Sequence, residues 1–154
     1  MLAVASTVLS VIAIGFSIFV FTEGRTRYKK DMFLKIHEIM MSESSYRGRQ
    51  VLLSRTFDED AINDLPLSER AEVSRALALY DLMGLYLRSG YLIEGDVISM
   101  WGDPADRAWR AAQPFVKRRA LQAGRPDAYS YFRYLVDRAR SSGVGASRSD
   151  FSGK

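Results

Sequence analysis

The most constraining feature is an apolar stretch, Leu2–Phe21, which contains no charged residue and no proline. Twenty residues in a helix rise about 30 Å, the thickness of the hydrocarbon core of a bilayer. Most of these residues are Leu, Ile, Val or Phe, which favour the centre of a membrane span. A core helix of a soluble domain rarely runs this far without a polar face. We therefore expect residues 1–22 to form a transmembrane anchor.

Four basic residues, here called the juxtamembrane basic cluster, follow this stretch directly: Arg25, Arg27, Lys29 and Lys30. Basic residues beside a span stay in the cytoplasm, so Met1 is expected outside and residues 23–154 inside. No basic residue precedes the stretch, which argues against a cleaved signal peptide. The chain contains no cysteine, in agreement with a reducing compartment. The sequence thus predicts a single-pass protein of the bacterial inner membrane.

Helical periodicity continues beyond the anchor, so we expect an all-α protein in which residues 23–140 form a small cytosolic helical bundle. Residues 26–55 are predicted to form one long helix, or two with a break near residues 42–45. The helix expected at 68–89 is apolar on nearly every face and should be the centre of the bundle. Residues 141–154 are rich in Ser and Gly and are expected to be a disordered tail.

The second half of the domain is predicted to contain three helices. A short helix at 95–101 precedes one at 104–123, because an Asp followed by Pro104 is a favourable helix start. Pro114 should bend the second of these helices, since it removes one backbone hydrogen bond. The last helix is expected at 127–140. Three large aromatic side chains should pack on or near the 68–89 helix: Trp101, Trp109 and Phe132.

Aromatic and glycine landmarks recur along the cytosolic part of the chain: Ala78–Gly84, Ser89–Ile93, Met100–Gly102, Trp109, Pro114 and Tyr131–Leu135. Their order, behind a single span, resembles the short bacterial membrane proteins catalogued as domain of unknown function 4760. The resemblance covers roughly residues 1–140. It implies a helical, cytoplasm-facing protein with one span, and it brings no catalytic signature or functional residue with it.

Several classes of chemistry are not expected from this sequence. His37 is the only histidine, so a site with two histidine ligands is excluded and no metal is expected. No phosphate-binding glycine loop is present, and the sequence indicates no cofactor and no small-molecule ligand. The net charge of +4 is too modest to indicate a nucleic-acid partner. These observations lean against an enzyme without excluding one.

Asp81 interrupts the most apolar of the predicted helices. A buried carboxylate needs a partner, and three arginines are the candidates: Arg47, Arg110 and Arg119. We expect a structural ion pair that fixes the register of the helices. A functional acid at this position is the alternative, and a deep pocket that held Asp81 beside unpaired arginines would favour it.

Two functional classes remain. The first is a membrane-anchored interaction module, whose partners are the lipid bilayer and either itself or another protein. Its basic residues, in the juxtamembrane basic cluster and from Lys117 to Arg140, could contact anionic headgroups. Within this class, the protein could be a component of bacterial stress or phage-defence systems, a hypothesis that rests only on its architecture. The alternative class is a membrane-surface enzyme that uses Asp and Arg residues without a metal.

Overall fold

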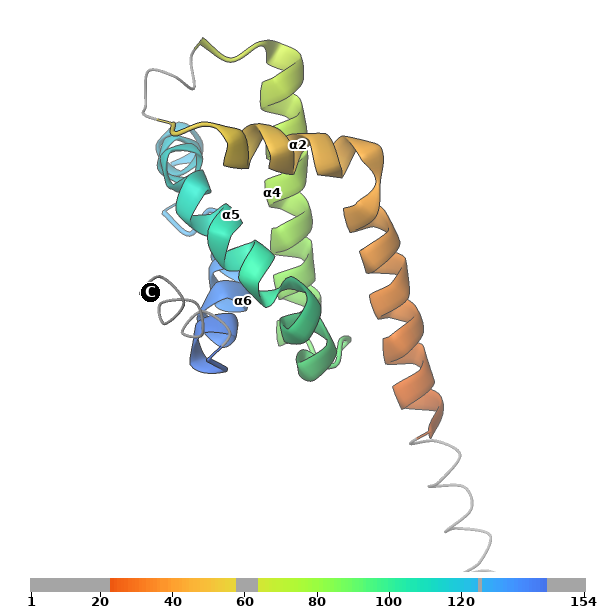
Figure 1. Ribbon diagram of the computed structural model, residues 1–154. Coiled ribbons are helices and arrows are strands. Elements are labelled where there is room, and N and C mark those ends of the chain that lie inside the picture. Colours follow the sequence, from red (N-terminus) through yellow and green to blue (C-terminus); the bar gives the residue numbers. More distant parts are fainter. Residues whose placement is uncertain (1–22, 58–63, 125, 144–154) are drawn as a thin grey trace, which may run out of the picture.

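The computed structural model describes residues 23–57, 64–124 and 126–143, and these contain helices but no β-strand. A helical segment at 23–41 precedes the helices α2 (Glu43–Ser54), α4 (Leu67–Arg88), α5 (Glu94–Ala123) and α6 (Ser130–Ser141). They form one bundle, from which the start of the 23–41 segment extends (Figure 1). The expected all-α helical bundle is confirmed.

The expected transmembrane anchor, residues 1–22, lies outside the described residues, as do residues 144–154 of the expected tail. Among the helices that the structure describes, none is both long and apolar enough to cross a membrane. The membrane span therefore stays a prediction from the sequence. Helix α6 ends at Ser141, one residue beyond the predicted boundary of the domain.

The predicted helix over 26–55 is divided at Ser42, and the chain changes direction there (Figure 1). The hydroxyls of Ser42 and Ser45 donate to the carbonyl oxygen of Ile39, at 2.7 and 3.1 Å. Arg49 Nη1 donates to the carbonyl of Met40 at 2.6 Å. Side chains thus take up carbonyl oxygens that a helix end leaves without an intrahelical partner, which stabilises the break.

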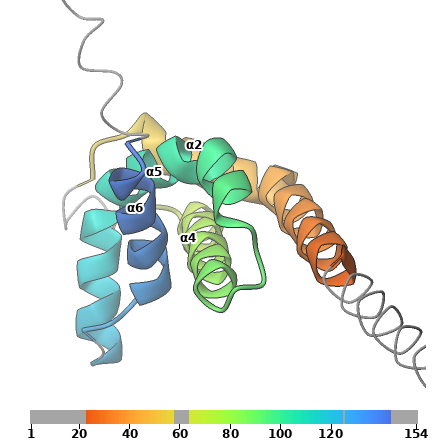
Figure 2. The same cartoon turned by 90° about the horizontal axis from the view of Figure 1, so that it is seen from below.

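One continuous helix, α5, replaces the two that were predicted on either side of Pro104. Its buried face passes through the proline without interruption: Val97, Trp101, Ala105, Ala108, Ala112 and Phe115. Burial of this face against the bundle outweighs the local cost of Pro104, which lies in the interior of the helix. The C-terminal part of α5, beyond Pro114, runs in another direction, as expected for a proline bend (Figures 1 and 2).

The centre of the bundle is an aromatic cluster built on α4. Tyr80 is fully buried and stacks on Phe132 with the ring centroids 4.7 Å apart. Trp101 meets Tyr80 edge-on at 6.4 Å, and Trp109 meets Phe132 edge-on at 5.0 Å. His37 lies against Trp101 at 5.6 Å. The predicted packing of the two tryptophans and Phe132 on or near this helix is confirmed.

Helix α4 lies between α6 and the 23–41 segment, and its most extensive contacts are with α6 and α2 (Figure 2). Two glycines set the closest approaches between helices. A Cβ atom on Gly84 would lie 1.9 Å from the carbonyl oxygen of Tyr131 in α6, and one on Gly48 would lie 2.2 Å from that of Glu72 in α4. Only glycine fits at either crossing.

An ion pair links α5 to α6. Asp106, which is 5 % exposed, accepts hydrogen bonds from Arg110 of its own helix and from Arg140 Nε of α6, the latter at 2.8 Å. Burial disfavours the charged carboxylate, but the two arginines outweigh it and hold the pKa of Asp106 below its usual value. Asp106 therefore lies in the interior of α5, where its carboxylate connects that helix to α6.

Candidate functional site

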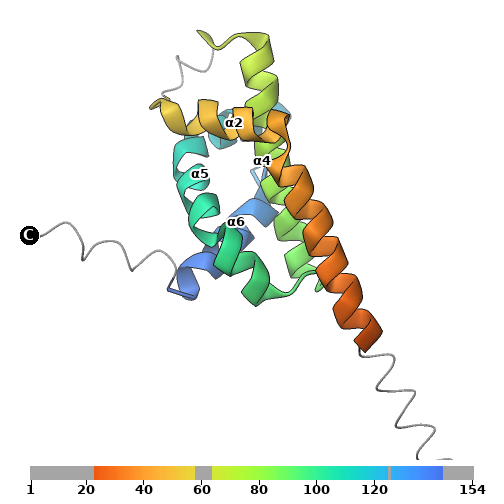
Figure 3. The ribbon, with the colours of Figure 1, turned by 45° about the vertical axis from the view of Figure 1, so that its right-hand side comes forward.

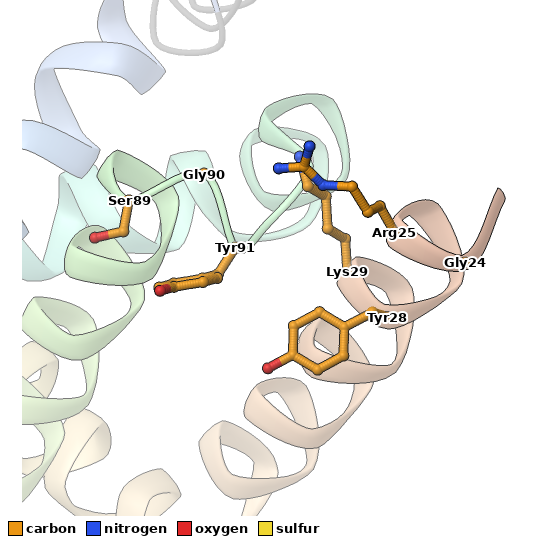
Figure 4. Close-up of a pocket in the computed structure, with 7 residues that line it drawn as sticks. All are labelled: Gly24, Arg25, Tyr28, Lys29, Ser89, Gly90 and Tyr91. Atoms are coloured by element: carbon orange, nitrogen blue, oxygen red, sulfur yellow. The ribbon is translucent and has the colours of Figure 1, made fainter. Parts of the chain in front are cut away.

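A pocket lies between the start of the 23–41 segment and the turn that joins α4 to α5 (Figure 4). Its volume is about 410 Å³, and it is lined by Gly24, Arg25, Tyr28, Lys29, Ser89, Gly90 and Tyr91. The volume falls in the range of small-ligand sites. Figure 3 shows the 23–41 segment running past α4 towards this end of the bundle. We call this cavity the juxtamembrane pocket.

The wall on α4 is a helix end with a defined backbone geometry. Gly90 has a φ of 74°, which is costly for any residue with a Cβ atom. Its N–H donates to the carbonyl of Leu87 at 3.1 Å, and the N–H of Tyr91 donates to that of Tyr86 at 2.9 Å. This pair of bonds is the Schellman motif. The Tyr91 ring also meets the Tyr86 ring edge-on at 6.0 Å, so its side chain is held in position.

The opposite wall is one face of the 23–41 helix. Residues 24, 25, 28 and 29 share that face, because positions four apart on a helix lie one above the other. Tyr28 and Tyr91, which are 55 % and 50 % exposed, extend from opposite walls, and the charged ends of Arg25 and Lys29 lie on the same side of the pocket (Figure 4). The site therefore combines two cations with two partly exposed aromatic rings.

The structure divides the juxtamembrane basic cluster into two pairs. Arg25 and Lys29 line the pocket, whereas Arg27 and Lys30 do not. Arg27 Nη2 lies 2.6 Å from Glu23 Oε1, and Lys30 is exposed. Lys29 is only partly exposed, and no hydrogen bond or ion pair of its side chain is found with the described residues. Neighbouring side chains of the cluster therefore differ in their surroundings.

At least three of the seven basic residues from Lys117 to Arg140 form ion pairs within the bundle. Arg138 Nη2 lies 2.5 Å from Glu94 Oε1, and Arg140 binds Asp106. Arg133 Nε lies 3.9 Å from Asp137 Oδ2. Arg138 and Arg140 therefore connect α6 to α5, and Arg133 is paired within α6.

Asp81 has a different partner from the arginine that was expected. Its Oδ1 accepts a hydrogen bond from the backbone N–H of Phe132 at 2.8 Å, and the described residues include no ion pair with this carboxylate. Phe132 lies in the first turn of α6, where N–H groups have no partner inside the helix. Asp81 of α4 therefore caps the N-terminus of α6. Its negative charge also interacts favourably with the positive end of the α6 dipole.

Replacing Asp81 by alanine should lower the free energy of unfolding by about 1–2 kcal/mol, because the first turn of α6 loses its cap. Asp81→Asn keeps an oxygen acceptor and should lose less. Urea denaturation followed by circular dichroism measures both values. A change below roughly 0.5 kcal/mol for Asp81→Ala would show that the cap contributes little.

Asp81 also lines a cavity of about 420 Å³ together with Arg119 and Tyr129. Tyr129 has a φ of 59°, the only positive value among the described non-glycine residues. Burial and the charge of Asp81 raise the pKa of the Tyr129 hydroxyl, while Arg119 opposes this. One oxygen of the Asp81 carboxylate accepts from the Phe132 amide, and the cavity places this carboxylate on the same lining as Arg119, so the enzyme alternative stays open.

His37, the single histidine, is a packing residue. Its ring lies between those of Phe33 and Trp101, at 6.3 and 5.6 Å. Its Nδ1 is buried without a hydrogen-bond partner in the described structure. No group of three or more metal-ligating side chains occurs among the described residues.

Sequence reasoning found the basic side of the juxtamembrane pocket but missed the other side. Residues 24–29 and 89–91 are separated by about sixty positions, and no spacing rule connects them. The signals that were available were Gly90 as a helix end and Tyr91 directly after it. Neither indicates which part of the chain lies opposite.

One of three comparisons with known proteins found a match. No curated protein and no solved structure matches the chain. The family model described as Domain of unknown function (DUF4760) matches residues 2–139, which include the apolar stretch and all of the described helices except the end of α6. The chain therefore belongs to the DUF4760 family.

Proposed function

We propose that this protein is a single-pass, membrane-anchored interaction module of the bacterial inner membrane. Residues 2–22 form the anchor, and the helical bundle lies on the cytoplasmic side. The observation that carries the proposal is the order of two segments near the N-terminus. An uncharged apolar stretch of bilayer length runs into a helix whose first turns bear basic residues and a pocket.

The charge distribution supports the proposed orientation. Arg25 and Lys29 stand four and eight residues beyond Phe21, about 6 and 12 Å along a helix. Helical side chains lean towards the N-terminus, which would direct both cations towards the bilayer. Basic residues in this position favour the cytoplasmic side of a span.

Exposed apolar side chains support a role in protein association. Several large apolar side chains of the first two helices are exposed, and their burial against a partner would be favourable: Leu34, Ile39, Met41, Tyr46 and Leu53. A second copy of this chain or another cytoplasmic protein would cover them. The bundle would then present a partner-binding face close to the membrane.

Extraction of membranes with alkaline carbonate tests the anchor. The full chain should stay in the pellet, because removal of about twenty apolar residues from a bilayer is strongly unfavourable. A variant that lacks residues 2–21 should move to the supernatant and serves as the control. Recovery of the full chain in the supernatant would contradict the proposal.

A reporter enzyme that is active only outside the cytoplasm tests the orientation. Fused after Lys154, it should stay inactive, and fused to a variant with glutamine in place of all four cluster residues, it should gain activity. Full activity of the first fusion would reverse the proposed topology.

A further inference from the structure

The juxtamembrane pocket has the composition of an anion site. None of its lining residues is acidic, and two of them are cationic. The carboxylate of Glu23, the acidic residue nearest along the chain, is held by Arg27 and lies outside the lining. Lys29 is partly buried at the pocket, and its ammonium group could donate charge-assisted hydrogen bonds to an anionic ligand there.

The other lining groups indicate what is attached to the anion. Tyr28 and Tyr91 present partly exposed rings from opposite walls. Tyrosine is enriched where an apolar bilayer meets water, because its ring is apolar and its hydroxyl is polar. Ser89 and Gly90 line the pocket on the same wall as Tyr91 (Figure 4). A small polar group with apolar carbon on one side suits this surface.

We propose that the juxtamembrane pocket binds the phosphate of an anionic phospholipid headgroup. Arg25 and Lys29 hold the phosphate oxygens, and Tyr28 and Tyr91 pack against the glycerol part. The inference rests on the proposed function, because lipid reaches the pocket only when residues 2–22 lie in the bilayer. A free phosphate compound offers the same anion, but the first lining residue, Gly24, stands three positions beyond Phe21 at the end of the apolar stretch, and this proximity favours a lipid.

The pocket differs from a diffuse basic surface in one testable respect. A diffuse attraction would depend on the number of charges near the membrane, whereas a pocket depends on which side chains line it. Lys29 and Lys30 are neighbours and carry the same charge. Lys29 lines the pocket and is partly buried, while Lys30 is exposed and does not line it. Replacing each in turn separates the two explanations.

The experiment uses the full chain in nonionic detergent micelles, titrated with dihexanoyl phosphatidylglycerol. Binding is followed by the amide NMR signals of Gly90 and Tyr91, which report on the wall opposite the cations. Saturable shifts are expected, and the zwitterionic dihexanoyl phosphatidylcholine should bind at least about fivefold more weakly, since one net charge at a membrane surface is worth about that factor.

Lys29→Gln should weaken binding of the anionic lipid by about fivefold or more, whereas Lys30→Gln should weaken it by less than about twofold, because its exposed charge is screened. Retained amide signals elsewhere in the bundle verify that each variant is folded. Equal losses in the two variants would overturn the pocket in favour of diffuse attraction. Equal binding of both lipids would overturn its selectivity for anions.

Inorganic phosphate and glycerol 3-phosphate form the second arm of the titration. Each should bind more weakly than the anionic lipid, because neither supplies the chain-bearing glycerol ester that packs on the two tyrosines. Equal or tighter binding of either would overturn the lipid assignment and identify a soluble phosphate ligand instead. Carbonate extraction is independent of these titrations, so failure of the pocket and failure of the anchor are distinguishable.

Discussion

Replacing Gly84 by alanine should lower the free energy of unfolding by about 3 kcal/mol or more, the largest effect that we expect from a single methyl group in this chain. The new Cβ atom would lie 1.9 Å from the backbone carbonyl oxygen of Tyr131. A backbone atom of a packed helix cannot move aside as the end of a long side chain can. Helix α6 would have to shift, and the hydrogen bond from Phe132 to Asp81, one turn away on α4, would be disturbed with it.

The measurement is urea denaturation of the full chain in micelles, followed by the fluorescence of Trp101 and Trp109. Gly95→Ala is the matched control, because Gly95 also lies in a helix but has nothing within 4 Å of an added Cβ. This variant should be unchanged or more stable by up to about 1 kcal/mol, since alanine favours helix more than glycine does. Similar midpoints for the two variants would show that the α4–α6 crossing is not as close as described.

Alkaline pH should destabilise the protein through Tyr80. Its side chain is fully buried, and its hydroxyl has no hydrogen-bond partner among the described residues. Burial raises the pKa of Tyr80 from 10.0 to about 12, although the charges of Arg49 and Arg107 oppose the shift. The folded state therefore keeps the proton where the unfolded chain releases it. The stabilisation is complete below pH 10 and is lost as the pH rises from about 10 to 12, by about 3 kcal/mol.

Tyr80→Phe isolates this effect, because it removes the ionisable hydroxyl and keeps the ring that stacks on Phe132. At pH 7 the variant should be as stable as the parent or more stable by up to about 1 kcal/mol, since a buried hydroxyl without a partner is lost. Between pH 9 and 12 the parent should lose about 3 kcal/mol more than the variant. Tyr91→Phe removes an exposed hydroxyl and should keep the parent's behaviour. An identical pH profile for Tyr80→Phe and the parent would rule out the assignment to this residue.

The two predictions concern one junction of the bundle. Gly84 allows α6 to approach α4 closely, and one turn earlier on α4 the Tyr80 ring stacks on Phe132 of α6. Asp81 caps α6 from the same part of α4. Three residues within about one turn of α4 therefore make specific contacts with α6, which begins about fifty residues later in the sequence. This junction explains why a carboxylate and a glycine interrupt an otherwise apolar sequence.

The sequence by itself predicted the helices, because their causes are local. Helical spacing of apolar residues, the serines at 42–45 and the glycine at 90 act within a few residues of their own positions. The bend beyond Pro114 also follows from local sterics, since a proline removes a hydrogen bond of its own helix. The fold class and the central place of α4 could therefore be read before any tertiary contact was known.

The same local rules failed where a distant surface decided the outcome. Asp103 and Pro104 have the pattern of a helix start, but α5 continues through them because its buried face is continuous. Helix α4 is apolar on most sides, yet Leu82 and Leu85 are only partly buried, since α2 and α6 are its main neighbours. Burial depends on which surfaces meet, and local spacing does not contain that information.

The candidate site shows both kinds of cause. Positive charge beyond an apolar stretch is a property of adjacent residues, so Arg25 and Lys29 were found from the sequence. Only the tertiary structure brings these two residues into one pocket with Ser89–Tyr91. It also decides that Asp81 binds a backbone amide instead of an arginine. The physical reason is that residue types do not show which backbone amides will bind a partner or which surfaces will enclose a cavity. They become partners only when packing brings distant helices together.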